Sequence, residues 1–210
     1  MNMKRNIVID KIKKRIAKAD NGSVFIIADF LNLAGYDAVR KALSRLTIEN
    51  VLIRVMRGMY KKPNYNEFIH DEVPASPDAI ARAIARNNNW TIGPKDDVAL
   101  NILGLTTQVP NVYKYISNGS NMEVDYLGTK IVFSKRSNKD VSGYSYKTIL
   151  IIEALRTLGS ERIDDNIRIK IAQKCTKSDF ELLNKEGIRS RKWIYEEIKK
   201  IMILGGYKYA

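Results

Sequence analysis

The residues best suited to chemistry in this sequence are polar and cationic side chains along one predicted helix. Opposite them, apolar residues recur at intervals of three and four, as in a helix that buries one face. Guanidinium, ammonium and hydroxyl groups donate hydrogen bonds to phosphate oxygens and to the acceptor edges of guanine and thymine. We therefore expect this polar face to bind in the major groove of DNA. Its members are Tyr36, Arg40, Lys41, Ser44, Arg45 and Thr47.

A second group of residues has the types that phosphoryl transfer requires. A nucleotidyltransferase uses a Gly-Ser turn followed by paired carboxylates that hold two magnesium ions. Gly119-Ser120 is followed by Glu123 and Asp125, but this spacing leaves no room for a strand between the turn and the acids. We interpret these residues as a hairpin turn with exposed carboxylates.

Other acidic and histidine residues have no catalytic or metal-binding spacing. His70 is the single histidine, and no glycine-rich phosphate loop occurs. Asp96-Asp97 and Asp164-Asp165 fall at predicted helix starts, where carboxylates interact favourably with the helix dipole. The sequence therefore predicts that the protein is not an enzyme and has no catalytic residue, no metal and no cofactor.

The elements around the polar face are those that would position it. Residues 7–19 read as a first helix, 23–26 as a short β segment, and 27–33 as a second helix closed by Gly35. The helix at 36–49 follows and carries the polar face. Its predicted buried face consists of Val39, Ala42, Leu43 and Leu46.

A basic hairpin is predicted directly after this helix. Residues 51–62 are rich in β-forming side chains, and Gly58 supplies the backbone angles of a tight turn. This hairpin would act as a wing along the phosphates or in the minor groove. Its candidate contact residues are Arg54, Arg57, Tyr60, Lys61 and Lys62.

The charge distribution favours a polyanionic partner. Residues 1–66 contain fourteen Lys or Arg and five Asp or Glu, so they carry +9 of the net charge of +13. A charged helix face is usually a solvated face, but such a surface has more balanced signs. We therefore predict that residues 1–66 form a winged helix-turn-helix domain that binds double-stranded DNA.

Composition sets the remaining expectations. The chain has 210 residues and 45% hydrophobic content, which suffices for a substantial core and fits two domains. No stretch approaches the roughly 18 apolar residues of a membrane-spanning helix, and the first residues lack the apolar region of a secretory signal. The single cysteine, Cys175, fits a reducing compartment. We expect a cytoplasmic protein with no membrane association.

The predicted fold class is α+β. Residues 67–76 are proline-containing and locally acidic, which predicts a linker before a C-terminal domain at 77–210. Strands are expected at 112–117, 122–126 and 130–134, forming a small antiparallel sheet. The predicted helices of this domain are 77–87, 94–103, 148–158, 163–174, 178–185 and 190–204.

The order of these motifs resembles the AbiEi-type antitoxins over about residues 5–135. The resemblance rests on the helix at 39–46, the hairpin at 53–60, Ile80-Ala81, and the segment GLTTQVP at 104–110. It implies an antitoxin of a type IV toxin-antitoxin, or abortive-infection, pair used in phage defence. In such a pair the N-terminal domain represses transcription of its own operon, and the C-terminal domain opposes a nucleotidyltransferase-like toxin.

Other functions remain open from the sequence. The chain fits a stand-alone winged-helix regulator whose C-terminal domain senses a ligand or mediates assembly. It also fits a module that binds a protein toxin directly. A third alternative is RNA binding, because aromatic residues on a sheet can stack bases. The tyrosines for that role are Tyr113, Tyr115 and Tyr126.

Overall fold

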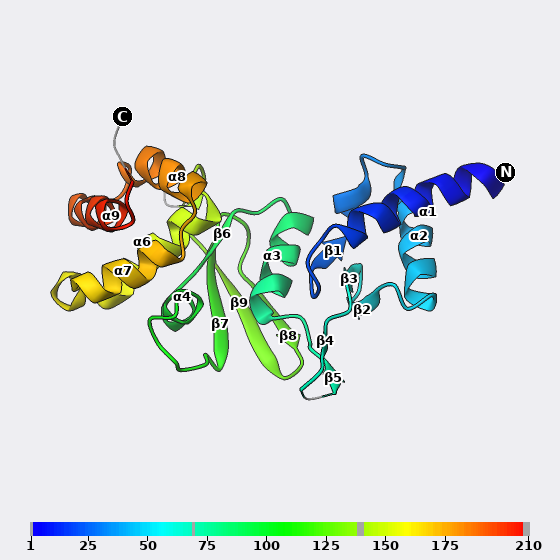
Figure 1. Ribbon diagram of the computed structural model, residues 1–210, viewed down its shortest axis with the longest axis horizontal. Helices are drawn as coiled ribbons and strands as arrows, with labels where there is room; N and C mark the ends of the chain where they lie inside the picture. The colour runs from blue at the N-terminus through cyan, green and yellow to red at the C-terminus, as the bar shows by residue number, and fades with distance from the viewer. Residues whose placement is uncertain (1, 69, 138–140, 208–210) are drawn as a thin grey trace. The chain divides into compact units, whose positions relative to one another are not determined.

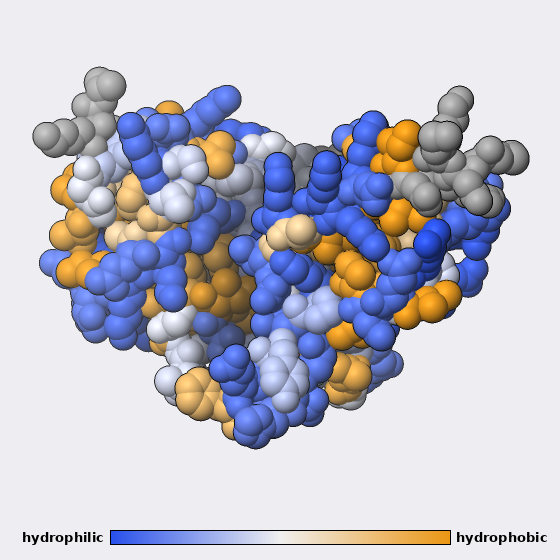
Figure 2. All heavy atoms as spheres, turned by 45° about the vertical axis from the view of Figure 1, so that its right-hand side comes forward, coloured by the Kyte–Doolittle hydropathy of each residue, from blue (hydrophilic) through white to orange (hydrophobic). Residues whose placement is uncertain are grey.

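The protein has a mixed α+β fold that divides into two compact units. The computed structural model describes residues 2–68, 70–137 and 141–207. The first unit is Met1–Asn89 and the second is Trp90–Ala210. Figure 1 shows the elements of each unit, and Figure 2 shows the atoms of one face, coloured by residue hydropathy. Within the described residues, no helix is both long and apolar enough to cross a membrane.

The first unit begins with the predicted order of helices and strands. Strands β1, β3 and β2 form an antiparallel sheet in that order, and β4 pairs with β5 in a separate ladder. The predicted second helix is a short 3₁₀ helix. The elements are α1 (Asn2–Ala17), β1 (Val24–Ile26), η1 (Ile27–Phe30), α2 (Tyr36–Ile48), β2 (Ile53–Met56), β3 (Met59–Lys61), β4 (Tyr65–Asn66), β5 (Asp71–Glu72) and α3 (Pro77–Asn87).

One apolar cluster holds α1, η1, α2 and the hairpin together. The predicted apolar stripe of α2 is buried in it, next to Ile12 and Ile16 of α1 and Phe30 of η1. Leu52 and Tyr60 bring the hairpin into the same cluster. Side chains of fully buried Leu, Ile or Phe each stabilise the fold by about 1.5–3 kcal/mol relative to exposure. The position of α2 is therefore fixed by its buried face.

The first unit extends further along the chain than the predicted domain of residues 1–66. The segment predicted as a linker, 67–76, contains β5, and Glu72 of that strand pairs with Lys61 of β3. Helix α3 contacts β1, and the Arg86 guanidinium donates to the Val24 carbonyl at 2.9 Å and lies 3.2 Å from the Asp29 carboxylate. These polar contacts between distant residues place α3 in the first unit rather than at the start of the C-terminal domain.

The second unit combines a four-stranded sheet with a group of helices. Most predicted boundaries lie within a few residues of the observed ones. Strand β6 was not predicted, and α4 begins three residues after the predicted helix start at residue 94. The elements are β6 (Ile92–Pro94), α4 (Asp97–Ile102), β7 (Val112–Ser117), β8 (Met122–Tyr126), β9 (Thr129–Lys135), α6 (Tyr146–Leu158), η2 (Ser160–Arg162), α7 (Asp165–Gln173), α8 (Lys177–Gly187) and α9 (Lys192–Leu204).

This sheet is mixed, whereas the sequence predicted an antiparallel one. Its order is β6-β7-β9-β8, with antiparallel pairs β6–β7 and β8–β9 and a parallel pair β7–β9. Strands β8 and β9 form the hairpin expected around Leu127-Gly128. The turn after β7 does not pair β7 with β8, because β9 inserts between them.

Helix α6 is the central helix of the second unit. Every residue from Thr148 to Leu155 is buried, and the helix contacts β6, α4, α8 and α9. Gly93 allows the approach of β6, since a Cβ atom at that position would lie 1.9 Å from Cγ2 of Ile149. An apolar helix with no exposed stripe is typical of a helix surrounded by other elements. Glu153 is the carboxylate within this buried run.

Candidate nucleic-acid interface

The polar face of α2 is exposed as the sequence predicted. Arg40, Lys41, Ser44 and Arg45 lie on the solvent side, opposite the buried stripe. Tyr36, in the first turn, is 59% exposed. Gly35 precedes the helix in an extended conformation, with φ −64° and ψ 159°. The face is therefore available to a partner, and its apolar counterpart fixes the orientation of the helix.

Two ion pairs order the cations of this face. The Arg40 Nε lies 3.6 Å from Oδ1 of Asp37, one turn before it. The Arg45 Nε donates to Oε1 of Glu49 at 2.8 Å, and Lys13 of α1 donates to Oε2 of the same carboxylate at 2.7 Å. Lys41 makes no ion pair within the described part of the chain. Exposed pairs of this kind are weak, so the arginines can exchange them for phosphate or base contacts.

Glu49 therefore holds cations from two helices at the end of α2. Hydrogen bonds from Lys13 and then Arg45 hold the pKa of its carboxyl below the ordinary value. The carboxylate remains charged at neutral pH and neutralises part of the local positive charge. The end of α2 is consequently less cationic than its composition suggested.

Thr47 has a structural contact that the sequence did not reveal. Its hydroxyl donates to the Leu43 carbonyl at 3.0 Å within the helix, and the side chain is half-buried. A hydroxyl that donates to a carbonyl of the preceding helical turn has no proton left to donate to a base. Thr47 is therefore less suited to base contact than Ser44, which is exposed.

The hairpin β2–β3 exposes two of its predicted contact residues. Arg54 and Arg57 are both exposed, and Arg57 with Gly58 forms the tip between Met56 and Met59. Gly58 has φ +75°, a conformation that glycine adopts at low cost. No described residue pairs with either guanidinium. The tip therefore presents uncompensated positive charge.

Three residues predicted as hairpin contacts have side chains that are buried or hydrogen-bonded within the first unit. Tyr60 is 6% exposed and belongs to the apolar cluster. Lys61 is 1% exposed, and its ammonium donates to the Glu72 carboxylate and the Val73 carbonyl. Lys62 is half-buried and donates to the carbonyls of Ala17 and Ala19, at 3.2 and 2.8 Å. These side chains stabilise the first unit instead of offering donors to a partner.

Helix α1 adds exposed cations that were not included among the predicted contacts. Lys11, Lys14 and Lys18 are exposed and have no ion pair with the side chains that the structure describes. Their spacing of three and four residues puts them on one side of α1. This spacing is the signal from which they could have been found. Arg15 differs, because it donates to Asn32 Oδ1 at 3.0 Å and lies over the Phe30 ring.

The groups considered for other chemistry have structural roles in the second unit. Tyr115 is fully buried and stacks on Phe133, and Tyr126 is buried, so neither offers a ring to an RNA base. Glu123 is exposed and pairs with Lys130 on the neighbouring strand, as expected for a hairpin carboxylate. Asp164 accepts a hydrogen bond from the backbone N–H of Ile167 and caps α7.

The segment GLTTQVP, at 104–110, follows α4 and leads to β7. Gly104 has φ +70°, and the Leu105 N–H donates to the Leu100 carbonyl, so the glycine terminates the helix. The Asn101 side-chain amide donates to the Gln108 carbonyl at 2.9 Å. This segment has a local structural role in the fold.

Comparison with known proteins gives a family but no activity. A family model described as "Family of unknown function (DUF6088)" matches residues 11–183. The match extends over both units and includes α2, the hairpin and the sheet of the second unit. No curated protein matches the chain. Because the match covers most of its length, the chain belongs to DUF6088, a family of unknown function.

Proposed function

We propose that the protein is a DNA-binding transcriptional regulator whose first unit acts as a winged helix-turn-helix. The observation that supports this is the exposed cationic face of α2, carried on a helix whose opposite face is buried. The order α1, β1, η1, α2, β2, β3 is the order expected of that domain. In this proposal α2 enters the major groove and the hairpin lies along the DNA backbone.

The dimensions and chemistry of α2 suit this role. A helix of 13 residues is about 20 Å long, and the major groove of B-DNA, about 12 Å wide, admits an α-helix. Arg40 and Arg45 are the specificity candidates, because a guanidinium can donate two hydrogen bonds to one guanine. Lys41, Arg54 and Arg57 are the backbone contacts, since each is an exposed cation without an acidic partner among the described residues.

The number of exposed cations determines the expected dependence on salt. Tyr60 and Lys61 are buried and Lys62 donates to backbone carbonyls. The exposed cations of α2 and the hairpin are Arg40, Lys41, Arg45, Arg54 and Arg57. The three backbone contacts, Lys41, Arg54 and Arg57, then give a slope of log affinity against log salt of about −2.7. Participation of the lysines of α1 would make the slope steeper.

A direct test measures binding to the DNA upstream of the protein's own gene. Mobility shifts or fluorescence anisotropy would compare that DNA with a scrambled duplex of equal length. We expect tighter binding to the natural sequence and a loss of that preference in Arg40→Ala. Lys185→Ala, an exposed lysine of the second unit, is the matched control. Equal affinity for the two duplexes would exclude a sequence-specific regulator.

We propose further that the regulator is the antitoxin of a type IV pair and opposes a nucleotidyltransferase-like toxin in the cytoplasm. The support is the resemblance of the motifs up to residue 135 to AbiEi-type antitoxins. In this role the protein acts by binding rather than by catalysis. Co-expression of the full chain with the adjacent gene tests the role. Relief of growth arrest would support it, whereas persistent arrest would leave a DNA-binding regulator alone.

A further inference from the structure

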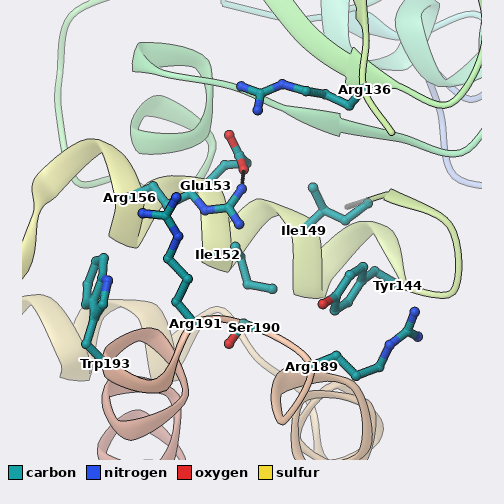
Figure 3. Close-up of a pocket in the computed structure, with 10 residues that line it drawn as sticks. All are labelled: Arg136, Tyr144, Ile149, Ile152, Glu153, Arg156, Arg189, Ser190, Arg191 and Trp193. Carbon is teal, nitrogen blue, oxygen red and sulfur yellow. Dashed lines mark hydrogen bonds and ion pairs between the residues drawn. The ribbon is translucent and has the colours of Figure 1, made fainter. Parts of the chain in front are cut away.

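A pocket in the second unit is lined by four arginines and one carboxylate. Its volume is about 490 Å³, within the range of small-molecule sites. The walls come from α6, from the residue after β9 and from the turn between α8 and α9. Figure 3 shows the side chains that line it. Its charged residues are Arg136, Glu153, Arg156, Arg189 and Arg191.

The carboxylate does not balance this charge. Glu153 is buried on α6 and accepts a hydrogen bond from Nη1 of Arg156. The Nε of Arg156 is buried and has no hydrogen-bond partner. A buried donor without an acceptor is unfavourable. Arg156 is therefore fixed by Glu153 but still has an unused donor.

Arg189 is held in place by neutral groups. Its guanidinium donates to the carbonyls of Gly143 and Ser142, at 2.9 and 3.2 Å, and lies 4.8 Å from the centre of the Tyr144 ring. A Cβ atom at position 143 would lie 2.6 Å from Nη1 of Arg189, so the glycine makes room for it. Carbonyls orient the guanidinium without neutralising it. Its positive charge therefore remains at the pocket.

The remaining two arginines have no partner within the described part of the chain. Arg136 and Arg191 are exposed, and neither guanidinium makes an ion pair or a hydrogen bond there. In Figure 3 they reach from opposite sides toward the Glu153 and Arg156 pair. Exposed arginines directed at the same point by separate segments form a site for an anion with several oxygens.

We propose that this pocket binds a nucleotide, with its phosphates on the arginines and its base on the apolar wall. Arginine forks match the oxygens of phosphate, and ring faces stack on bases. Trp193 and Ile152 line the same pocket, and Trp193 stands beside Arg191 in Figure 3. The volume exceeds that of an inorganic phosphate, so the pocket has room for a sugar and a base. This inference does not rest on the DNA-binding proposal, because every lining residue belongs to the second unit.

Titration of the full chain with defined probes tests the site. Calorimetry would compare AMP, ATP and GTP with inorganic phosphate and adenosine. Tryptophan fluorescence would report contact with Trp193 when compared with the fluorescence of Trp193→Phe, which retains Trp90. We expect at least one nucleotide to bind more tightly than both phosphate and adenosine. Arg136→Ala and Arg191→Ala should each lower the affinity for that nucleotide by about tenfold, the effect expected from loss of a charge-assisted hydrogen bond. Both side chains are exposed, so we expect unchanged circular dichroism spectra.

Neighbouring lysines provide matched controls. Lys135 and Lys192 are exposed, adjacent in sequence to the two arginines and outside the pocket lining. Lys135→Ala and Lys192→Ala should leave nucleotide affinity unchanged, and so should Arg40→Ala on α2. The inference is overturned by absence of nucleotide binding, by equal affinity for nucleotide and phosphate, or by equal losses in the lysine and arginine variants. A loss in Arg40→Ala alone would place the nucleotide on the first unit and also overturn it.

Discussion

The ammonium group of Lys61 is buried against the carboxylate of Glu72. Lys61 ends strand β3, and Glu72 belongs to β5, eleven residues further along the chain. The same ammonium donates to the Val73 carbonyl, and Glu72 also accepts from the backbone N–H of Asn64 at 3.0 Å. This contact joins the hairpin to the segment that follows it. Lys61, which the sequence predicted to contact DNA, therefore holds the hairpin in place.

Removal of the Lys61 ammonium should destabilise the first unit. Breaking a buried pair from one side leaves the other charge without compensation, so we expect Lys61→Ala to lower the free energy of unfolding by about 3 kcal/mol. Urea denaturation followed by circular dichroism measures this change. Lys41→Ala is the control, because Lys41 is exposed and unpaired among the described residues. Equal stability of the two variants would show that the Lys61 contact does not hold the hairpin.

The same pair predicts loss of stability in acid. Burial alone would raise the pKa of the Glu72 carboxyl, but hydrogen bonds from Lys61 and Asn64 outweigh it and place the pKa below the ordinary value of 4.5. The pair therefore contributes fully above pH 4.5 and is lost as pH falls through the lower folded-state pKa. Denaturation midpoints between pH 6 and pH 3 should fall less steeply for Glu72→Gln than for the native chain. If the midpoints of the two proteins fell equally with pH, the Glu72 carboxylate would not be the source of the acid sensitivity.

Hairpin and helix arginines should affect DNA binding differently. Arg57→Ala removes a backbone contact, so affinity should fall for natural and scrambled DNA alike and the salt slope should become shallower by about 0.9. Arg40→Ala should weaken only the natural sequence, by about 1–3 kcal/mol. Binding measured from 50 to 200 mM salt separates the two effects. If both variants lost affinity equally for natural and scrambled DNA, Arg40 would not take part in base recognition.

The β8–β9 turn contains a leucine that can be replaced to increase stability. Leu127 has φ +49° and is 73% exposed, and Gly128 follows with φ +78°. Asparagine tolerates the left-handed region better than leucine, and Asn-Gly is the preferred pair in such two-residue turns. We expect Leu127→Asn to raise the free energy of unfolding by about 0.5–1 kcal/mol, because it relieves the unfavourable left-handed conformation of leucine. Leu127→Ala, which retains the unfavourable φ, should give no comparable gain.

The thiol of Cys175 should react slowly in the folded protein. Burial raises its pKa from 9.0 to about 11, and its Sγ lies 3.4 Å from the Ile171 carbonyl. Because the thiolate is the reactive form, alkylation by iodoacetamide at pH 8 should be about 100-fold slower than in the unfolded chain. Cys175 is the single cysteine, so mass spectrometry reports it directly. Equal rates with and without guanidinium would contradict the burial effect.

The sequence predicts an element correctly where one periodic pattern accounts for the whole of it. Helices α2, α3 and α6 follow their predicted ranges closely, because apolar stripes, caps and terminating glycines act within the element itself. Strand β6 was missed, since three buried residues ending in proline carry no alternating pattern. The order of the four-stranded sheet was also missed, because the turn after β7 does not determine which strand pairs with it.

The sequence by itself determined the cationic face of α2, because helical spacing separates Arg40, Lys41, Ser44 and Arg45 from the buried stripe. It could not distinguish Arg57, exposed at the hairpin tip, from Lys61, buried four residues later. Only the tertiary structure decided that difference, because it depends on a carboxylate from a distant strand. The arginine pocket was likewise invisible in the sequence, since its residues come from segments that meet only after folding around α6.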